Sequence, residues 1–380
     1  MLCRDGALID TLTPDLLVIG GGIIGINVAR ELKRRHPDAS VHVLDKEGTG
    51  TEHGSGRNSG VLHAGFYYTA DSHKAVMCRE GNALLTDYCL ERGLPINRCG
   101  KLVVTQSEAE LDALDELKRR GDANGVELQV VSVEEARSIE PRAKTVERAL
   151  FSPTTASVDP LALVGAMQGD AQDAGVVFHH GTAYQGRDGR RVVTSQGGFE
   201  PGYVVNAAGL YADRVARDFG FSEAYRILPF KGLYLYGEAV EHPIRTHIYP
   251  VPNLHNPFLG VHFTVTVDGH VKLGPTAIPA FWREQYEGWS GFDAGELLEV
   301  LGRQLGLLMG ADFDFRRLAA SELRKYQRSH LVALSTPLAT DIEVADYRRW
   351  GRAGIRAQLL DIRTRSLEMD FVFEGDARSF

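Results

Sequence analysis

The feature that most constrains the fold is a glycine-rich turn between an apolar strand and a helical pattern. Residues 14–25 read PDLLVIGGGIIG, which contains the pattern G-x-G-x-x-G. A second strand-like segment, 41–45, ends in Asp45, about 20 residues after the last of these glycines. Strand, glycines, helix, second strand and acid in this order are the fingerprint of an adenine-dinucleotide site in an α/β fold.

Each part of the fingerprint has a mechanical role. Gly20 permits the tight turn, Gly22 lets a pyrophosphate approach the backbone, and Gly25 lets the helix pack close to the strand. The helix N-terminus offers unpaired N–H groups and a positive dipole to the phosphates. Asp45 would accept hydrogen bonds from a ribose diol and repel a 2′-phosphate, which disfavours NADP. The cofactor contacts expected from this segment are Gly20, Gly22, Ile24, Gly25, Asp45 and Lys46.

Composition excludes several classes of protein. The 380 residues carry a net charge of −8, which argues against binding to nucleic acid. We find no apolar run long enough to cross a bilayer, and residues 1–13 lack the apolar core of a signal peptide. The four cysteines form no C-x-x-C pair, so we expect reduced thiols, no metal site and a cytoplasmic protein.

Periodicity predicts the remaining elements coarsely. We expect helices over 72–91, 107–120 with Ser107 as its cap, and 294–309, and a further helix capped by Asp159. Strands are expected over 99–105 and 203–209. Beyond residue 228 the strand-like segments 233–236, 247–250 and 259–273 alternate without regular helices between them, which indicates a mostly antiparallel sheet.

These patterns predict an α/β (α+β overall) architecture. A discontinuous Rossmann-like dinucleotide-binding domain would hold an inserted, mostly antiparallel substrate domain, with the cofactor at their boundary. The expected boundaries are 14–85, 150–225 and 335–380 for the first domain, and 86–149 and 226–334 for the second.

Two segments favour FAD over NAD. The Gly-, Ser- and Asn-rich loop 48–68 follows Asp45 and could wrap an extended cofactor, and the strand ending at Gly209 carries small residues that allow close approach of a dinucleotide. Arg57, Asn58 and Ser59 more simply serve the flavin or its phosphates than the substrate, although Asn and Ser also form turns on local grounds. The further cofactor contacts expected here are Arg57, Asn58, Ser59, Ala207, Ala208 and Gly209.

Motifs spread over nearly the whole chain carry a resemblance to a known family. They are GSGRNSGVLHAGFYY (54–68), NAAGLYAD (206–213), PFKG (229–232), YPVP (249–252), GVHFT (260–264), GIRAQ (354–358) and DFVFE (370–374). In this order they resemble FAD-dependent oxidoreductases of the D-amino-acid oxidase type, and within that group the L-2-hydroxyglutarate dehydrogenases or oxidases. The resemblance implies hydride transfer from the substrate Cα to flavin N5 while a base takes the hydroxyl proton.

The resemblance also assigns expected roles. Arg356 sits where related flavoenzymes hold a substrate carboxylate, and a bidentate guanidinium suits that ligand. Lys231 would hold the second carboxylate of a dicarboxylate or lie near flavin N5, unless it is an ordinary solvated lysine. His63 and His262 are the candidate bases, because histidine titrates near neutral pH. The further substrate contacts expected are Tyr67, Tyr249 and Gln358.

Other readings stay open at the level of sequence. The substrate could be another 2-hydroxy acid, an amino acid or glycerol 3-phosphate, and the first fingerprint alone would also fit an NAD-dependent dehydrogenase. Family members continue past the segment 370–374 into a helix that faces the flavin, so the end at Phe380 favours a flavin-binding protein without turnover. The electron acceptor would be a quinone, another carrier or oxygen, with at most peripheral attachment to the inner membrane.

Overall fold

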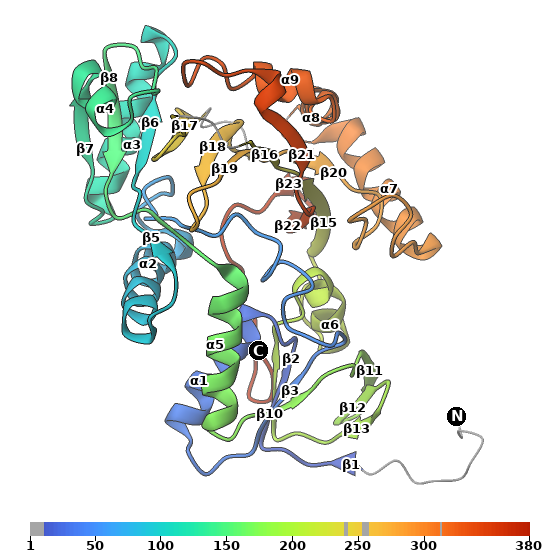
Figure 1. The fold of residues 1–380 in the computed structure, drawn as a ribbon. Helices are drawn as coiled ribbons and strands as arrows, with labels where there is room; N and C mark the ends of the chain where they lie inside the picture. The colour runs from blue at the N-terminus through green and yellow to red at the C-terminus, as the bar shows by residue number, and fades with distance from the viewer. Residues whose placement is uncertain (1–10, 239–241, 253–257, 312–313) are drawn as a thin grey trace.

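The computed structural model describes residues 11–238, 242–252, 258–311 and 314–380. Figure 1 shows a small parallel sheet with flanking helices at one end of the molecule and a large curved sheet at the other. This arrangement confirms the expected mixed α/β class. Segments far apart in the sequence meet between the two ends, where the site described below lies.

The parallel sheet has the strand order β10-β3-β2-β14. Two helices, α1 and α5, lie side by side on one face of it, and the ion pair between Arg30 and Asp170 (2.9 Å) joins them. The bounds are β2 Leu16–Ile19, α1 Ile23–Arg35, β3 Val41–Leu44, α5 Pro160–Asp173, β10 Val177–His179 and β14 Tyr203–Asn206.

Sequence explains why these elements form where they do. Apolar residues at every position of β2 and most of β3 suit strands covered on both faces. Asp159 caps α5 by accepting from the backbone N–H groups of Leu161 and Ala162, and Pro160 occupies the first turn, as predicted. The core between sheet and helices is made of Val18, Ile26, Ala29, Val43, Leu163, Val164 and Met167.

Two small additions complete this end of the molecule. A four-stranded sheet, ordered β1-β13-β12-β11, packs beside the parallel sheet. Residues 378–380 run along the free edge of β14, where the Phe380 N–H donates to Val204 O (3.0 Å) and Asn206 N–H donates to Phe380 O (2.8 Å). The bounds are β1 Thr11–Leu12, β11 Tyr184–Asp188, β12 Arg191–Thr194 and β13 Gly197–Phe199.

The large sheet has eight strands in the order β21-β16-β19-β18-β17-β6-β8-β7. Adjacent strands of this sheet run antiparallel, except for β6 and β17. These two run parallel, and their register places Lys101 beside His247. The bounds are β6 Lys101–Val104, β7 Gln129–Ser132, β8 Arg148–Ser152, β16 Leu235–Gly237, β17 His247–Pro250, β18 His262–Val265, β19 Val271–Gly274 and β21 Tyr347–Trp350. The predicted mostly antiparallel sheet is therefore present.

Two further sheets bridge the ends of the molecule. In one, ordered β20-β15-β22-β23, the long strands β15 and β22 pair antiparallel over their whole length. The other is the short sheet β4-β9-β5. The bounds are β4 Val61–Leu62, β5 Ile96–Asn97, β9 Ala156–Val158, β15 Tyr225–Gly232, β20 Ile278–Pro279, β22 Gly354–Asp361 and β23 Ser366–Leu367.

The remaining helices cover the outer faces of these sheets (Figure 1). Ser72 caps α2 and Asp293 caps α7, both close to the predicted starts. The bounds are α2 His73–Arg92, α3 Leu111–Ala123, α4 Val133–Ile139, α6 Ala212–Asp218, α7 Ala294–Gly310, α8 Phe315–Arg324 and α9 Arg328–Ala333, with single 3₁₀ turns at Glu108–Glu110, Gly209–Tyr211 and Val344–Asp346.

One local prediction, the Ser107 cap, was wrong. The Ser107 side chain makes no capping hydrogen bond, because a 3₁₀ turn precedes α3 and the Glu110 carboxylate instead accepts from the Gln106 N–H (2.7 Å). The strand-like segment 259–273 forms a hairpin within the predicted antiparallel sheet, in which a turn closed by a hydrogen bond from Gly269 N to Thr266 O separates β18 from β19. The domain boundaries stay a prediction, since β22 and β15 were assigned to different domains yet form one ladder.

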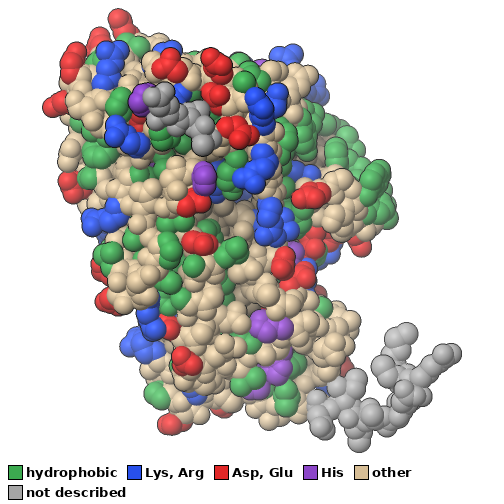
Figure 2. Space-filling view, in the orientation of Figure 1, with side chains coloured by type: hydrophobic (Ala, Val, Ile, Leu, Met, Phe, Trp, Pro, Cys, Tyr) green, Lys and Arg blue, Asp and Glu red, His purple; other side chains and the backbone are tan. Residues whose placement is uncertain are grey.

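Helix α7 presents an apolar face to the surface. Leu298 and Met309 are 72% and 75% exposed, and Trp289 just before the helix is 77% exposed. Figure 2 shows hydrophobic side chains gathered at the edge of the molecule where α7 lies in Figure 1. Over the described ranges, every helix is too short or too polar to cross a membrane.

Candidate active site

A long groove starts at the carboxyl ends of the parallel strands. Its first part is a cavity of about 800 Å³, lined by the turn after β2, the end of β3, the turn after β14 and helix α6. Open α/β sheets bind ligands at this position, outside the carboxyl ends of the strands. The predicted cofactor residues that line it are Gly20, Gly22, Ile24, Asp45, Lys46, Asn58, Ala207, Ala208 and Gly209.

Close backbone packing explains two of the glycines. Gly20 has φ +114°, and a Cβ there would lie 2.2 Å from Ala207 O. At Gly25 a Cβ would lie 1.8 Å from Gly20 O. The turn after β2 and the turn after β14 therefore fit together only without side chains, which leaves a smooth cradle for a bulky, extended ligand.

The acid of the fingerprint is held by backbone. Asp45 accepts hydrogen bonds from Gly21 N (3.0 Å) and Glu47 N (2.8 Å). Burial raises the pKa of Asp45, and the two N–H groups oppose that shift. The carboxylate keeps lone pairs on the groove side, where a ribose diol would donate to it. Lys46 beside it pairs with Glu284 (2.8 Å) and Glu47.

The loop after β3 closes over the start of α1. Ser55 accepts from Ile23 N (2.8 Å), and a Cβ at Gly50 would lie 2.1 Å from Gly21 O. Asn58 donates to Gly54 O and Ser55 O and accepts from Gly60 N (2.8 Å), so its amide shapes the loop. This is the turn-forming role weighed for Asn58 from sequence, and the side chain still lines the groove.

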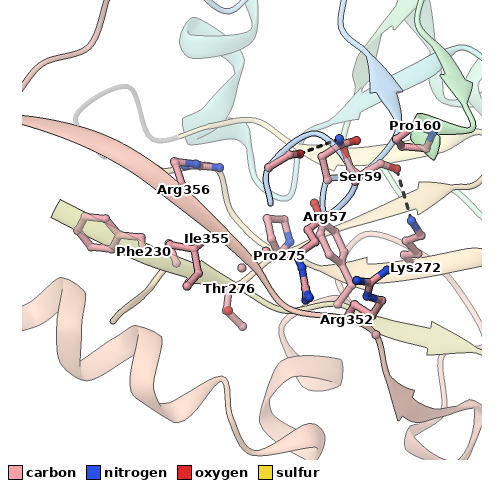
Figure 3. A pocket seen from close by; sticks show the side chains of 18 of the residues that line it. Arg57, Ser59, Pro160, Phe230, Lys272, Pro275, Thr276, Arg352, Ile355 and Arg356 are labelled. Atoms are coloured by element: carbon pink, nitrogen blue, oxygen red, sulfur yellow. Dashed lines mark hydrogen bonds between the residues drawn. The ribbon is translucent and has the colours of Figure 1, made fainter. Parts of the chain in front are cut away.

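The groove continues into a second cavity of about 520 Å³ between this loop and strands β15 and β22. Figure 3 shows Arg356 at one end of it and Arg57, Arg352 and Lys272 at the other. The Arg57 guanidinium stacks over Tyr286 at 4.2 Å and donates to Glu52 O (2.6 Å). Lys272 reaches Ser59 O at 3.5 Å. Four cations around one cavity make it attractive to an anion.

The third part is a small chamber of about 100 Å³, which shares Ser59 and Arg356 with the second cavity. His63, Tyr249 and His262 form its wall. The rings of Tyr249 and His262 stack at 3.6 Å. The structure therefore brings together four residues that were named from distant segments of the sequence, and it places them at the inner end of the groove.

Hydrogen bonding fixes the protonation of His262. Its Nδ1 lies 2.8 Å from Gly260 O, which can only accept, so Nδ1 carries the proton and Nε2 has a free lone pair. Burial lowers the pKa of His262 to about 3. This imidazole is therefore neutral at physiological pH and presents an acceptor.

The partner of His63 is a buried lysine. Lys101 Nζ lies 3.0 Å from His63 Nδ1, and its side chain is fully buried. Burial lowers the pKa of Lys101 to about 7. Burial and the positive charge of Lys101 hold the pKa of His63 well below its usual value.

Three residues predicted for the substrate do not line the groove. Lys231 is buried on β15 between Phe230 and Gly232, which both face the second cavity, so strand alternation turns Lys231 to the opposite face. Gln358 donates to Glu368 O (2.7 Å) and ties β22 to the following segment. The Tyr67 hydroxyl is buried, with no hydrogen-bond partner in the described part of the chain.

Sequence reasoning missed three cations of the site: Lys101, Lys272 and Arg352. Lys101 was detectable in principle, because it is the one charged residue of a strand, 101–104, that is otherwise apolar and is buried at every position. Lys272 alternates with the buried residues Val271 and Leu273, which only indicates that it faces away from their core. Arg352 lies in a loop and carries no periodic signal.

A cluster of Glu47, His53 and Glu284 borders the groove, and its ligand atoms lie within 4.8 Å of one another. Lys46 already pairs with both carboxylates, and His53 Nε2 lies 3.0 Å from Glu47. The positive charge at this place is thus supplied by the protein, and we assign it no metal.

Comparison with curated proteins gives relatives along nearly the whole chain. The mitochondrial L-2-hydroxyglutarate dehydrogenase of Bos taurus is 36% identical over 396 residues, covering 99% of this chain and 84% of the relative. The L-2-hydroxyglutarate dehydrogenase of Escherichia coli (strain K12) is 33% identical over 371 residues, covering 96% and 87%.

Solved structures share the fold. An L-alpha-glycerophosphate oxidase from Mycoplasma pneumoniae with FAD bound superposes with a TM-score of 0.72 at 21% identity, covering 93% of this chain and 85% of that one. A glycine oxidase from Geobacillus kaustophilus gives 0.66 at 21% identity, covering 93% and 85%. The family model described as FAD dependent oxidoreductase (DAO) matches residues 15–363. With its dinucleotide groove in place and this match over most of its length, the chain belongs to the DAO family of FAD-dependent oxidoreductases.

Proposed function

We propose that this chain oxidises L-2-hydroxyglutarate to 2-oxoglutarate with FAD as its cofactor. The observation that carries the proposal is the chamber of Arg356, His63 and His262 at the inner end of the dinucleotide groove. It combines a carboxylate-binding cation with neutral imidazoles, which is what a 2-hydroxy acid needs. The names of the curated relatives support the choice of substrate.

FAD fits the groove on three observations. The side-chain-free cradle at Gly20 and Gly25 admits a pyrophosphate, Asp45 faces the ribose position, and the apolar side chain of Ile24, 67% exposed, lines the cavity. When bound, FAD supplies a hydride acceptor for the substrate Cα. The groove leads from this cradle past Arg57, Asn58 and Ser59 to the chamber.

Arg356 is the residue that we assign to the first carboxylate. It projects from β22 into both the second cavity and the chamber, and it has no acidic partner among the described residues. Its guanidinium lies 5.1 Å from the Phe258 ring, which limits its freedom. A bidentate pair with the substrate would fix the hydroxyl-bearing carbon beside His63 and His262. Lys272 and Arg352, rather than Lys231, share the cavity and suit the second carboxylate.

The chamber also handles the hydroxyl proton. His262 presents a bare Nε2 that accepts a hydrogen bond from the substrate hydroxyl, yet a pKa of about 3 makes it a poor proton acceptor. His63 is the second candidate, and its Nδ1 contact with Lys101 leaves Nε2 for the substrate. Both histidines therefore orient the hydroxyl, and one of them removes its proton.

Anaerobic reduction of the bound flavin tests the proposal. L-2-hydroxyglutarate should bleach the flavin absorption band of the purified protein, and the D isomer should leave it unchanged. Glycerol 3-phosphate and glycine are the matched controls, because the two solved structures with this fold are named as oxidases of these compounds. A band that one of these bleaches, and L-2-hydroxyglutarate does not, would contradict the proposed substrate.

We further propose that the electrons pass to a quinone, another carrier or oxygen, with peripheral contact to a membrane when the acceptor is a quinone. The apolar face of α7 with Trp289 supports such contact, because Arg316 lies at its end, donating to Leu308 O (3.1 Å), and would face anionic lipid. The wild-type protein should co-sediment with anionic vesicles, whereas the Leu298→Glu variant should stay in the supernatant. Equal binding of both proteins would contradict this contact.

A further inference from the structure

Lys101 is an unusual residue for its position. It starts β6 in the middle of the eight-stranded sheet, and its side chain is fully buried. Lysines are almost never fully buried without a charged partner. No carboxylate within the described residues pairs with Lys101. Its contact of 3.0 Å with His63 Nδ1 is the hydrogen bond that the structure gives to the amine.

Aromatic rings enclose the rest of the amine. Nζ lies 5.3 Å from the ring centre of Phe66, 5.1 Å from Tyr67 and 4.5 Å from Tyr249. These faces tolerate a cation but accept no proton. The titratable or charged groups around the Lys101–His63 pair are Cys78 on α2, Cys99 before β6, His247 and Tyr249 on β17, His262 on β18, Tyr67 after β4 and Arg356 on β22.

The other neighbours are already engaged. His247 Nδ1 accepts from Val265 N (3.0 Å), and its Nε2 lies 3.4 Å from both Cys99 Sγ and Ser157 Oγ. Burial raises the pKa of Cys99 to about 11 and also raises that of Cys78, so both are neutral thiols at physiological pH. Proton exchange with Lys101 is therefore confined to His63.

The contact of 3.0 Å has two possible proton arrangements. When Lys101 is an ammonium, it must donate to Nδ1, and the proton of neutral His63 then sits on Nε2. When Lys101 is a neutral amine, Nδ1–H donates to it, and Nε2 is left with a lone pair on the side of the chamber. The protonation of Lys101 thus selects which face His63 shows to a substrate.

We propose that Lys101 is a positioning residue that acts through His63, selecting its proton-accepting tautomer and storing the substrate proton. The inference rests on the proposed function. As hydride leaves the substrate Cα for the FAD that the groove would hold, the substrate O–H bond breaks and a bond forms between that proton and His63 Nε2. The Nδ1–H bond breaks in turn, and its proton joins Lys101 Nζ. The imidazole stays neutral, and the ammonium returns its proton by the reverse route after product leaves.

This relay solves a problem that His63 alone would face. An imidazolium in the buried chamber is strongly disfavoured, and Arg356 nearby adds to the penalty. Passing the charge to Lys101 places it among three aromatic faces. The pair accepts a proton near neutral pH although the isolated histidine would not.

The first test measures Lys101 directly and needs no substrate. The chain is labelled with ¹³C at lysine Cε and titrated by NMR with and without FAD, and the Lys101 signal is identified by its loss in Lys101→Arg. We expect this signal to titrate near pH 7, and the ¹⁵N signals of His63 to exchange their Nδ1 and Nε2 character over the same range. A Lys101 signal that remains that of an ammonium up to pH 10 would overturn the inference.

The second test follows flavin reduction by L-2-hydroxyglutarate between pH 6 and 9. The rate should rise about tenfold per pH unit below 7 and then level off, because neutral Lys101 is the active form. Lys101→Arg keeps a permanent donor beside Nδ1, so it should reduce the rate about 100-fold and remove the inflection. Lys118→Arg, a change at a half-buried lysine on α3 that pairs with Asp122 outside the site, is the matched control and should retain both the rate and the inflection.

The outcomes separate the two proposals. If wild-type protein is reduced by L-2-hydroxyglutarate and Lys101→Arg keeps the inflection near pH 7, the role of Lys101 is refuted while the function stands. If no reduction occurs in wild-type protein that binds FAD, the function itself fails. Circular dichroism and FAD content of each variant ensure that a lost rate is not a lost fold, and the NMR titration of wild-type protein is decisive even if Lys101→Arg is slow to fold.

Discussion

The cofactor groove and the substrate chamber are built in opposite ways. The groove is made of backbone: glycines without room for a Cβ, a helix N-terminus, and turns after β2 and β14 that fit against each other. The chamber is walled by side chains, among them His63, Tyr249, His262 and Arg356 from four separate segments, and Lys101 contacts His63 from behind. The groove therefore recognises a ligand by the space that its backbone leaves, and the chamber by the polar side chains that line it.

Gly20→Ala should have the largest effect, because the added Cβ would meet backbone atoms of the groove rather than a side chain that could move aside. A Cβ would lie 2.2 Å from Ala207 O at φ +114°, which costs about 3 kcal/mol or more. We expect loss of bound FAD, measured by absorbance after gel filtration. Gly48→Ala in the following loop has nothing within 4 Å of its Cβ and should bind FAD normally. Full FAD content in Gly20→Ala would show that the cradle is not needed.

Arg356→Ala should weaken substrate binding in the chamber and leave FAD binding in the groove unchanged. We expect kcat/KM for L-2-hydroxyglutarate to fall about 100-fold through a higher KM, because a charge-assisted pair is lost. FAD content should be unchanged. Arg363→Ala, at an exposed arginine outside the site, is the control for removal of a positive charge. If Arg356→Ala loses FAD and keeps its KM, the boundary that we draw between the two regions is misplaced.

Lys101→Met tests how much the buried Lys101 amine lowers the stability of the fold when it is charged. The folded pKa of about 7 lies below the ordinary 10.5, so the unfolded chain binds more protons between these values and stability rises with pH. For this one group the gain from pH 7 to 9 is about 2 kcal/mol. The difference in the free energy of unfolding between wild type and Lys101→Met, measured by urea titration, should change by this amount over that range. A difference independent of pH would mean that Lys101 is charged in the folded state.

Asp45→Ala should have the smallest effect of the four. It removes an acceptor for the ribose diol but leaves the glycine cradle intact, so FAD should bind about tenfold more weakly. Fluorescence titration of the flavin-free protein measures this change. Asp38→Ala, at an exposed acid between α1 and β3, should leave affinity unchanged. Unchanged affinity in Asp45→Ala would remove the carboxylate from the groove.

The difference between the backbone-built groove and the side-chain-built chamber also determines which of the two could be predicted from the sequence. The groove was predictable because Gly20, Gly25 and Asp45 lie within one βαβ unit, where spacing along the chain determines spacing in the fold. His63, His262 and Arg356 were found only through family resemblance. Their meeting depends on pairings between distant strands, which periodicity cannot supply.

Two lysines show why the orientation of a side chain in a strand is hard to predict from sequence. Lys101 and Lys231 both lie in apolar strands, and both are buried. Which face of the sheet each side chain takes depends on register, and a shift by one residue reverses it. Lys231 was expected in the site and faces away from it, whereas Lys101 was overlooked and contacts His63.

The parallel ladder between β6 and β17 has a consequence for how the molecule assembles. It pairs residues 101–104 with residues 247–250, so Lys101 reaches its place beside His247 only after a long intervening stretch of chain has been closed. Contacts between such distant segments form slowly, whereas the βαβ unit around Gly20 is local. We therefore expect the βαβ unit to form first. The β2–β14 ladder that completes the cofactor groove and the β6–β17 ladder beside the substrate chamber should both form later.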